Sequence, residues 1–217
     1  MTDTILTGPY SPLYSPWKGA EFSARYAPIV KHTLVSPDRC YILERLLRHT
    51  EKVPGDVFEC GVYKGGTARL LADTMRWVCS TKTLHLFDTF TGMPDTDAKL
   101  DKHKKGDFAD TSLAAVESYI GARSFVKYHS GFIPDTFSEV PDDIQISFAH
   151  VDVDIYRSVM DCLEFIWPRL SAGGVVIFDD YGFPTCPGAK DAVDAFFEHT
   201  EALPVCLPTG QAFAYKV

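Results

Sequence analysis

The chain has 217 residues, with 21 Lys and Arg against 29 Asp and Glu, so its formal net charge is −8. At roughly 150 residues per domain, this length predicts one main domain with a sizeable core. A content of 46% hydrophobic and 13% aromatic residues excludes a disordered polyelectrolyte. The shortage of basic residues argues against a general nucleic-acid binder, which needs clustered Lys and Arg to neutralise phosphates.

Membrane insertion and metal-thiolate chemistry are also disfavoured. No stretch approaches the ~20 continuous apolar residues that cross a bilayer, and the first ten residues do not read as a signal peptide. We therefore expect a cytoplasmic protein with no membrane partner. The six cysteines form no C-x-x-C pair, which favours small buried side chains in a reducing compartment.

Residues 1–36 are predicted to form an irregular N-terminal arm. Prolines at positions 9, 12, 16 and 28 limit the length of any regular element there. Aromatic side chains would let this arm pack over a pocket or against a second copy of the chain in a homo-oligomer, with loose terminal structure as the alternative. Residues 37–217 are predicted to form a single domain.

Strand and helix patterns alternate through that domain. An amphipathic helix begins at Asp38 and ends before Pro54. Strands are predicted at 57–60, 83–87, 125–128, 144–151 and 175–178, with helices near 65–75, 113–119, 155–167 and 189–196. Two final segments, 203–207 and 211–217, flank a Pro-Thr-Gly turn and predict a terminal antiparallel hairpin. This order indicates an α/β fold with a doubly wound, mostly parallel sheet, in which ligands bind at the C-terminal strand ends.

A glycine-rich turn, Glu59–Thr67, follows the first strand. Its glycines would let the backbone approach a ligand, and the following helix N-terminus would offer free N–H groups. The turn does not fit the dinucleotide pattern G-x-G-x-x-G because Tyr63 replaces a glycine, and Glu59 suits an ammonium group better than a pyrophosphate. An ordinary tight turn is the alternative.

The second strand ends in Asp88. A carboxylate at this position can accept hydrogen bonds from both hydroxyls of a ribose. The competing interpretation is a cap on the segment that follows. The polar stretch 95–110 comes soon after and predicts a mobile lid, with a plain solvated loop as the alternative.

Four carboxylates follow the fourth and fifth strands: Asp152, Asp154, Asp179 and Asp180. Like charges at one sheet edge raise one another's pKa, and a divalent cation relieves the repulsion. All-oxygen ligands favour Mg²⁺ or Mn²⁺ over zinc. Helix or turn capping explains one acid on each strand but not two, so a metal site is the favoured interpretation.

The combination of motifs resembles the macrocin O-methyltransferase (TylF-type) family of S-adenosylmethionine- and Mg²⁺-dependent enzymes. The resemblance covers roughly residues 33–196. It is carried by Glu59–Thr67, Phe87–Pro94, Val151–Tyr156, Trp167–Gly174 and Phe178–Gly182. It implies a Rossmann-like class I methyltransferase domain with a seven-stranded sheet, which methylates a hydroxyl of a sugar or polyketide.

Site roles follow from the same resemblance. The family's metal ligands fall on Asp152, Asp179 and Asp180, and its general base falls on Asp154. The cofactor site falls on Thr33, Glu59, Gly61, Tyr63, Gly65, Thr67 and Asp88. Two departures are Val153, where relatives often have Thr, and the less typical sequence around Cys186.

Residue chemistry is consistent with this reading. A cation that binds a sugar hydroxyl lowers its pKa, and Asp154 could then take the proton. His150 and His129 are expected near the site as structural or substrate-contacting groups. Two other functions stay open at this stage: a metal-independent methyltransferase of the same fold, and a non-catalytic scaffold that binds S-adenosylmethionine or a nucleotide.

Overall fold

The computed structural model describes residues 14–217, so the first part of the predicted arm lies outside the described residues. The described chain forms one seven-stranded sheet in the order β3-β2-β1-β4-β5-β7-β6. Its strands are β1 (Asp56–Cys60), β2 (Leu84–Asp88), β3 (Val126–Ser130), β4 (Ile146–Val151), β5 (Leu170–Phe178), β6 (Val205–Cys206) and β7 (Ala212–Tyr215).

Strands β1 to β5 pair in parallel, whereas β7 pairs antiparallel with both β5 and β6. The predicted doubly wound sheet and its terminal antiparallel hairpin are therefore confirmed. The strand order reverses between β1 and β4, because the chain first builds outward to β3 and then returns beside β1. Such a reversal leaves a crevice at the C-terminal strand ends, where ligands bind in open α/β sheets.

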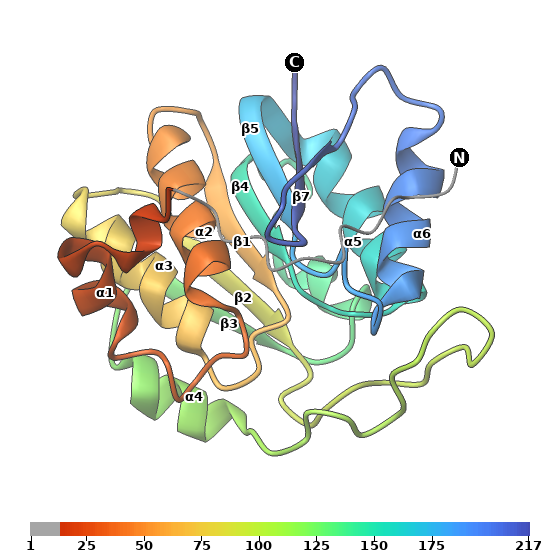
Figure 1. Ribbon diagram of the computed structural model, residues 1–217, viewed down its shortest axis with the longest axis horizontal. Coiled ribbons are helices and arrows are strands. Elements are labelled where there is room, and N and C mark those ends of the chain that lie inside the picture. Colours follow the sequence, from red (N-terminus) through yellow and green to blue (C-terminus); the bar gives the residue numbers. More distant parts are fainter. Residues whose placement is uncertain (1–13) are drawn as a thin grey trace.

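Helices cover both faces of the sheet (Figure 1). One face carries α1 (Ala20–Tyr26), α2 (Pro37–His49), α3 (Gly66–Trp77) and α4 (Leu113–Ile120), and the other carries α5 (Tyr156–Arg169) and α6 (Pro187–Phe197). Two short 3₁₀ helices, η1 (Pro16–Lys18) and η2 (Asp135–Glu139), are the other helical elements between residues 14 and 217. Within residues 14–217, no helix has the length and apolar character needed to span a bilayer.

The two hydrophobic cores follow from the alternation of side chains along the strands. On β1, Val57 packs with the α2 and α3 side chains, whereas Phe58 and Cys60 pack with α5 and α6. Successive side chains of a strand point to opposite faces, so an uninterrupted apolar run is buried on both sides. This double burial fixes the strand ends rigidly beneath the site.

The N-terminal arm differs from its prediction. Residues 20–26 form α1, and Phe22 and Ile29 are buried in the core beside α2. The prolines at 16 and 28 leave a proline-free stretch long enough for two helical turns, and Phe22 and Tyr26 lie four residues apart on one face of it. Residues 20–26 of the predicted arm are therefore helical and packed beside α2, whereas residues 27–36 contain no helix or strand.

The long connection between β2 and α4 contains no helix or strand. It is anchored at its middle, because the buried Asp101 carboxylate accepts a 2.9 Å hydrogen bond from the backbone N–H of Tyr156 at the start of α5. Figure 1 shows this connection extending below the sheet toward α6. It thus borders the C-terminal strand ends, as a lid would, while its mobility stays a prediction.

Candidate functional site

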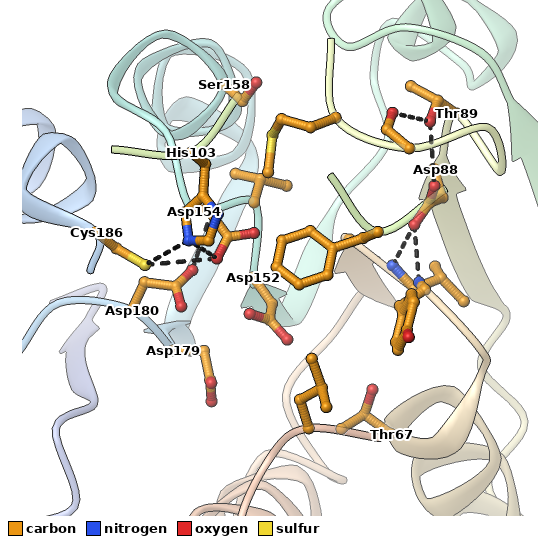
Figure 2. Close-up of a pocket in the computed structure, with 18 of the residues that line it drawn as sticks. Thr67, Asp88, Thr89, His103, Asp152, Asp154, Ser158, Asp179, Asp180 and Cys186 are labelled. Atoms are coloured by element: carbon orange, nitrogen blue, oxygen red, sulfur yellow. Dashed lines mark hydrogen bonds and ion pairs between the residues drawn. The ribbon is translucent and has the colours of Figure 1, made fainter. Parts of the chain in front are cut away.

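A cavity of about 300 Å³ opens at the C-terminal ends of β1, β2, β4 and β5. Its walls come from the segment before α2, the β1–α3 turn, the β2–α4 connection and the ends of β4 and β5. Figure 2 shows two sides of this cavity, with Thr67 and Asp88 on one side and Asp152, Asp154, Asp179 and Asp180 on the other. The sheet edge expected to bind ligands is therefore hollowed, and acids line both of its sides.

Most predicted site residues line this cavity: Thr33, Gly61, Tyr63, Thr67, Asp88, Asp152, Asp154, Asp179 and Asp180. Glu59 and Gly65 do not. Strand ends that are adjacent in the sheet bring the lining residues together although they are far apart in sequence.

Close packing requires glycine at two positions of the β1–α3 turn, because a side chain there would collide with neighbouring backbone. Gly61 has φ +87°, and a Cβ there would lie 1.8 Å from the carbonyl oxygen of Asp152. Gly66 accommodates the backbone of His32, to whose carbonyl its N–H donates a 2.9 Å hydrogen bond. Both contacts draw neighbouring segments toward the cavity, including Thr33, which follows His32. The tight-turn interpretation is therefore correct for this turn, and it coexists with the turn's position at the cavity.

Asp88 holds this turn in place. Its Oδ2 accepts hydrogen bonds from the backbone N–H groups of Val62 and Tyr63, at 2.7 and 2.9 Å, and its Oδ1 accepts one from Phe90 at 2.7 Å. A carboxylate offers about four acceptor positions, so most of its capacity serves the backbone. Asp88 still lines the cavity, where its remaining capacity is available to a ligand.

A buried chain of charges lies behind the cavity. His150 on β4 pairs in register with Glu59 on β1, its Nδ1 lies 3.0 Å from Glu59 Oε1, and its Nε2 lies 3.4 Å from Asp179 Oδ1. Burial alone would lower the pKa of His150, but the two carboxylates raise it to about 10. Glu59 is fully buried against this imidazolium, so the structure does not bring it to the cavity surface.

Neighbouring side chains already compensate the negative charge of Asp179. Arg39 of α2 forms an ion pair with its Oδ2, and Gln211 Nε2 donates a 2.8 Å hydrogen bond to its Oδ1. Burial would raise the pKa of Asp179, but the contacts with His150, Arg39 and Gln211 hold it below the usual value.

Asp152 and Asp180 lack such compensation. Burial and the nearby charge of Asp179 raise the pKa of Asp152 well above the usual range, and no hydrogen bond from the described residues offsets this. Burial and the charges of Asp152 and Asp154 do the same to Asp180, although the backbone N–H of Asp154 donates a 3.0 Å hydrogen bond to it. Three carboxylates facing one cavity, two of them with raised pKa values, fit a hard divalent cation.

Asp154 lies beside this group in a left-handed conformation, with φ +60°. Its Oδ1 lies 3.4 Å from Cys186 Sγ and 3.6 Å from His103 Nε2. Burial raises its pKa, and the neighbouring His103 acts in the opposite direction. A non-glycine residue with positive φ at a cavity wall indicates a side chain whose direction the fold imposes.

Sequence reasoning missed Arg39, Gln211 and His103 as site residues. Arg39 and Gln211 belong to no strand-end motif, and only the three-dimensional arrangement brings them to Asp179. His103 lies in the connection predicted as a lid, and it reaches the cavity near Asp154. His129 forms hydrogen bonds with His85 and Glu139 and does not line the cavity, whereas the sequence predicts that it lies near the site.

Comparisons with known proteins agree with this architecture. A family model described as macrocin-O-methyltransferase (TylF) matches residues 18–204. The chain is 30% identical to demethyldecarbamoylnovobiocin O-methyltransferase of Streptomyces niveus, over 78% of this chain and 69% of that protein. It is also 30% identical to mycinamicin III 3''-O-methyltransferase of Micromonospora griseorubida, over 73% of this chain and 68% of that protein.

A third relative, from Streptomyces olivaceus, is 8-demethyl-8-(2,3-dimethoxy-alpha-L-rhamnosyl)-tetracenomycin-C 4'-O-methyltransferase. It is 32% identical over 76% of this chain and 67% of that protein. Among solved structures, the O-methyltransferase NovP matches with a TM-score of 0.77 and 26% identity, covering 86% of this chain and 82% of that one. An O-methyltransferase from Bacillus cereus in complex with SAH shares the fold, with a TM-score of 0.58 and 15% identity over 89% of this chain and 91% of that one. The chain therefore belongs to the macrocin O-methyltransferase (TylF) family and is an S-adenosylmethionine-dependent O-methyltransferase.

Proposed function

We propose that this enzyme methylates a hydroxyl of a sugar carried by a small natural product, with the help of a divalent cation such as Mg²⁺. One observation carries the proposal: Asp152, Asp154, Asp179 and Asp180 face the same cavity as the β1–α3 turn. The curated relatives support the substrate class, since one is named for the 3''-position of mycinamicin III and another for a rhamnosyl-tetracenomycin.

The cofactor would lie along the β1–β2 side of the cavity. This wall is formed by Thr33, by the turn residues Gly61, Val62, Tyr63 and Thr67, and by Asp88. S-adenosylmethionine, when bound, supplies an activated methyl group, so the reaction needs no protein nucleophile. The fixed backbone of the turn would hold the two substrates in near-attack geometry, which contributes much of the rate enhancement in transfer reactions.

The cation would bind Asp152, Asp179 and Asp180. When bound, it supplies Lewis acidity that lowers the pKa of the acceptor hydroxyl. The raised pKa values of Asp152 and Asp180 support this assignment, because burial and the neighbouring carboxylates disfavour their charged forms and a bound cation would offset this cost. Arg39, which also lines the cavity, forms an ion pair with Asp179 and would hold this ligand in one orientation.

Asp154 would be the general base. Its carboxylate is accessible from the cavity and lies two residues beyond Asp152 on the same strand end. The raised pKa of Asp154 brings it nearer to neutrality, where a carboxylate is a more effective proton acceptor.

Apolar side chains at the cavity support an acceptor with a hydrophobic scaffold. Leu34 is 66% exposed and Phe132 is 40% exposed, and both line the cavity. Exposed apolar side chains at a binding site mark contact with an apolar ligand surface. A sugar attached to a polyketide or aromatic core would place its hydroxyl inside and its core against these residues.

The decisive experiment measures methyl transfer to a panel of glycosylated natural products after treatment with EDTA. We expect activity to disappear in chelator and to return when Mg²⁺ is added. Full activity in chelator would instead support a metal-independent enzyme, an alternative favoured by the ion pair of Arg39 with Asp179. The non-catalytic scaffold is no longer supported, given the family to which the chain belongs.

A further inference from the structure

Three side chains of different chemistry converge on one wall of the cavity. His103 comes from the β2–α4 connection, Asp154 follows β4, and Cys186 lies at the start of α6 (Figure 2). Cys186 Sγ lies 3.4 Å from Asp154 Oδ1 and 3.6 Å from His103 Nε2, and the last two atoms lie 3.6 Å apart. These three ligand atoms form an almost equilateral triangle.

We propose that His103, Asp154 and Cys186 form a second cation site, selective for a thiophilic divalent ion such as Zn²⁺. Zinc binds Cys sulfur at ~2.3 Å, His nitrogen at ~2.0–2.1 Å and carboxylate oxygen at ~2.0–2.2 Å, in a tetrahedron. Tetrahedral angles at those lengths separate the ligand atoms by ~3.3–3.6 Å. The observed separations match this range, so the three side chains could bind the ion without rearrangement.

The histidine is oriented as metal-binding histidines are. Its Nδ1 lies 3.1 Å from Asp107 Oδ2, four residues along the same connection. A carboxylate at Nδ1 fixes the tautomer and leaves the Nε2 lone pair for a metal ion, an arrangement that accompanies most metal-bound histidines. Asp107 is thus the outer partner that a zinc site requires.

The donor set separates this site from the carboxylates at Asp152, Asp179 and Asp180. Oxygen-only donors favour a hard ion, whereas a mixed nitrogen, oxygen and sulfur set favours Zn²⁺. Cys186 is only 3% exposed, and its thiol must lose its proton to solvent when the ion binds. All three residues line the cavity, so water from the cavity would supply the fourth ligand.

Occupancy would have two consequences. The ion would take the oxygen of Asp154 that accepts the proton, so methyl transfer would stop; this consequence rests on the function proposed above. It would also attach the β2–α4 connection to α6 through His103, adding to the existing hydrogen bond between Asp101 and α5. The site would therefore close the cavity in an inactive state.

The test uses Co²⁺ as a spectroscopic probe, added to the full chain with excess Mg²⁺ to occupy the hard site. We expect a thiolate-to-cobalt charge-transfer band and the intense visible bands of a tetrahedral ion. Cys186→Ser should abolish the charge-transfer band, and His103→Asn should weaken both signals. Cys206→Ser is the matched control, because Cys206 is exposed and lies outside the cavity, and it should leave the spectrum unchanged. A missing band in the unmodified protein, or a band that persists in folded Cys186→Ser, would overturn the proposal.

A second measurement separates this site from the proposed function. Each variant's methyl transfer is measured with and without stoichiometric Zn²⁺ and compared with its own zinc-free rate. Zinc should inhibit the unmodified protein and Cys206→Ser but spare Cys186→Ser; equal inhibition of Cys186→Ser would contradict the proposal. If Asp154 proves dispensable for turnover while the cobalt band is present, the general base is wrong and the cation site stands.

Discussion

The carboxylates on the two sides of the cavity differ in how far the protein itself compensates their charge. On the β1–β2 side, Asp88 accepts three backbone hydrogen bonds, so most of its acceptor capacity serves to hold the turn. On the β4–β5 side, Asp152 receives no hydrogen bond from the described residues, and its pKa is raised well above the usual range by burial and by Asp179. The carboxylate on the first side is stabilised by the fold itself, whereas those on the second side carry charge that a ligand must compensate.

This difference shows where folding free energy and function conflict. A carboxylate bonded to backbone N–H groups stabilises the fold and preorganises the cofactor wall. Carboxylates buried close together destabilise the fold, and they persist at sites where a cation or a proton transfer uses them. Substitutions on the two sides should therefore have opposite effects on stability, although both should impair function.

The largest expected effect concerns the proposed general base. Asp154→Asn keeps the size of the side chain but removes the proton acceptor, so kcat should fall by ~10²- to 10⁴-fold. Binding of S-adenosylmethionine, measured by calorimetry, should stay unchanged because Asp154 lies on the opposite side. Asp95→Asn, in the exposed part of the β2–α4 connection, is the matched control and should retain activity. Near-normal turnover of Asp154→Asn would exclude its role.

The next effect tests the cofactor side. Asp88→Ala leaves the N–H groups of Val62, Tyr63 and Phe90 without their acceptor, and we expect a loss of about 3 kcal/mol in the free energy of unfolding. Denaturant titration measures this loss, and affinity for S-adenosylmethionine should fall with it. Asp88→Asn keeps one carbonyl oxygen and should be intermediate. If the free energy of unfolding of Asp88→Ala equals that of the unmodified protein, these hydrogen bonds do not stabilise the turn.

A smaller effect with the opposite sign is expected across the cavity. Asp152→Asn removes one of the buried like charges, so the metal-free protein should gain on the order of 1 kcal/mol in stability while losing activity. Mg²⁺ should raise the melting temperature of the unmodified protein, because a ligand that binds only the folded state stabilises it, and this shift should vanish in Asp152→Asn. Destabilisation by Asp152→Asn, or an unchanged Mg²⁺ shift, would contradict the assignment.

Much of the fold and the position of the candidate site could be predicted, because the ends of buried strands can be recognised in the sequence. Apolar runs ending in Asp88, Asp152 and Asp179 identify parallel strands, and parallel strands place their ends along one edge. Glu59 shows the limit of this reasoning. It follows the same pattern, yet the β1–β4 register sets it beside His150, and that charge pair keeps it behind the cavity.

Contacts between distant segments could not be predicted. Arg39 reaches Asp179 from a helix 140 positions earlier in the chain, and His103 reaches Asp154 from an irregular connection. Neither pairing has a local pattern, since irregular backbone has no period and packing alone decides where it lies. The helix α1 within the arm was missed for a related reason, because the spacing of the prolines drew attention away from the short amphipathic segment that contains Phe22.

Two buried histidines on the strands of the sheet, His150 and His129, have pKa values shifted in opposite directions. His150 has its pKa raised to about 10 despite burial, by its flanking carboxylates. Its ion pairs thus contribute stability that is fully present below the unfolded pKa of ~6.5 and is lost as pH rises through about 10. Burial lowers the pKa of His129, assisted by the adjacent His85 and opposed by Glu139.

The smallest predicted effect follows from the His129 shift. Below pH ~6.5 the unfolded chain takes up a proton at this position that the folded protein resists, so the free energy of unfolding falls as pH decreases toward the lowered folded pKa. His129→Gln cannot be protonated and should flatten this acidic slope in denaturant titrations between pH ~5 and ~8. His199→Gln, on the exposed surface, should keep the original slope. If the slope is unchanged in His129→Gln, other groups determine how stability depends on pH in the acidic range. The opposite pKa shifts of the two histidines would then make no measurable contribution to the stability of the fold.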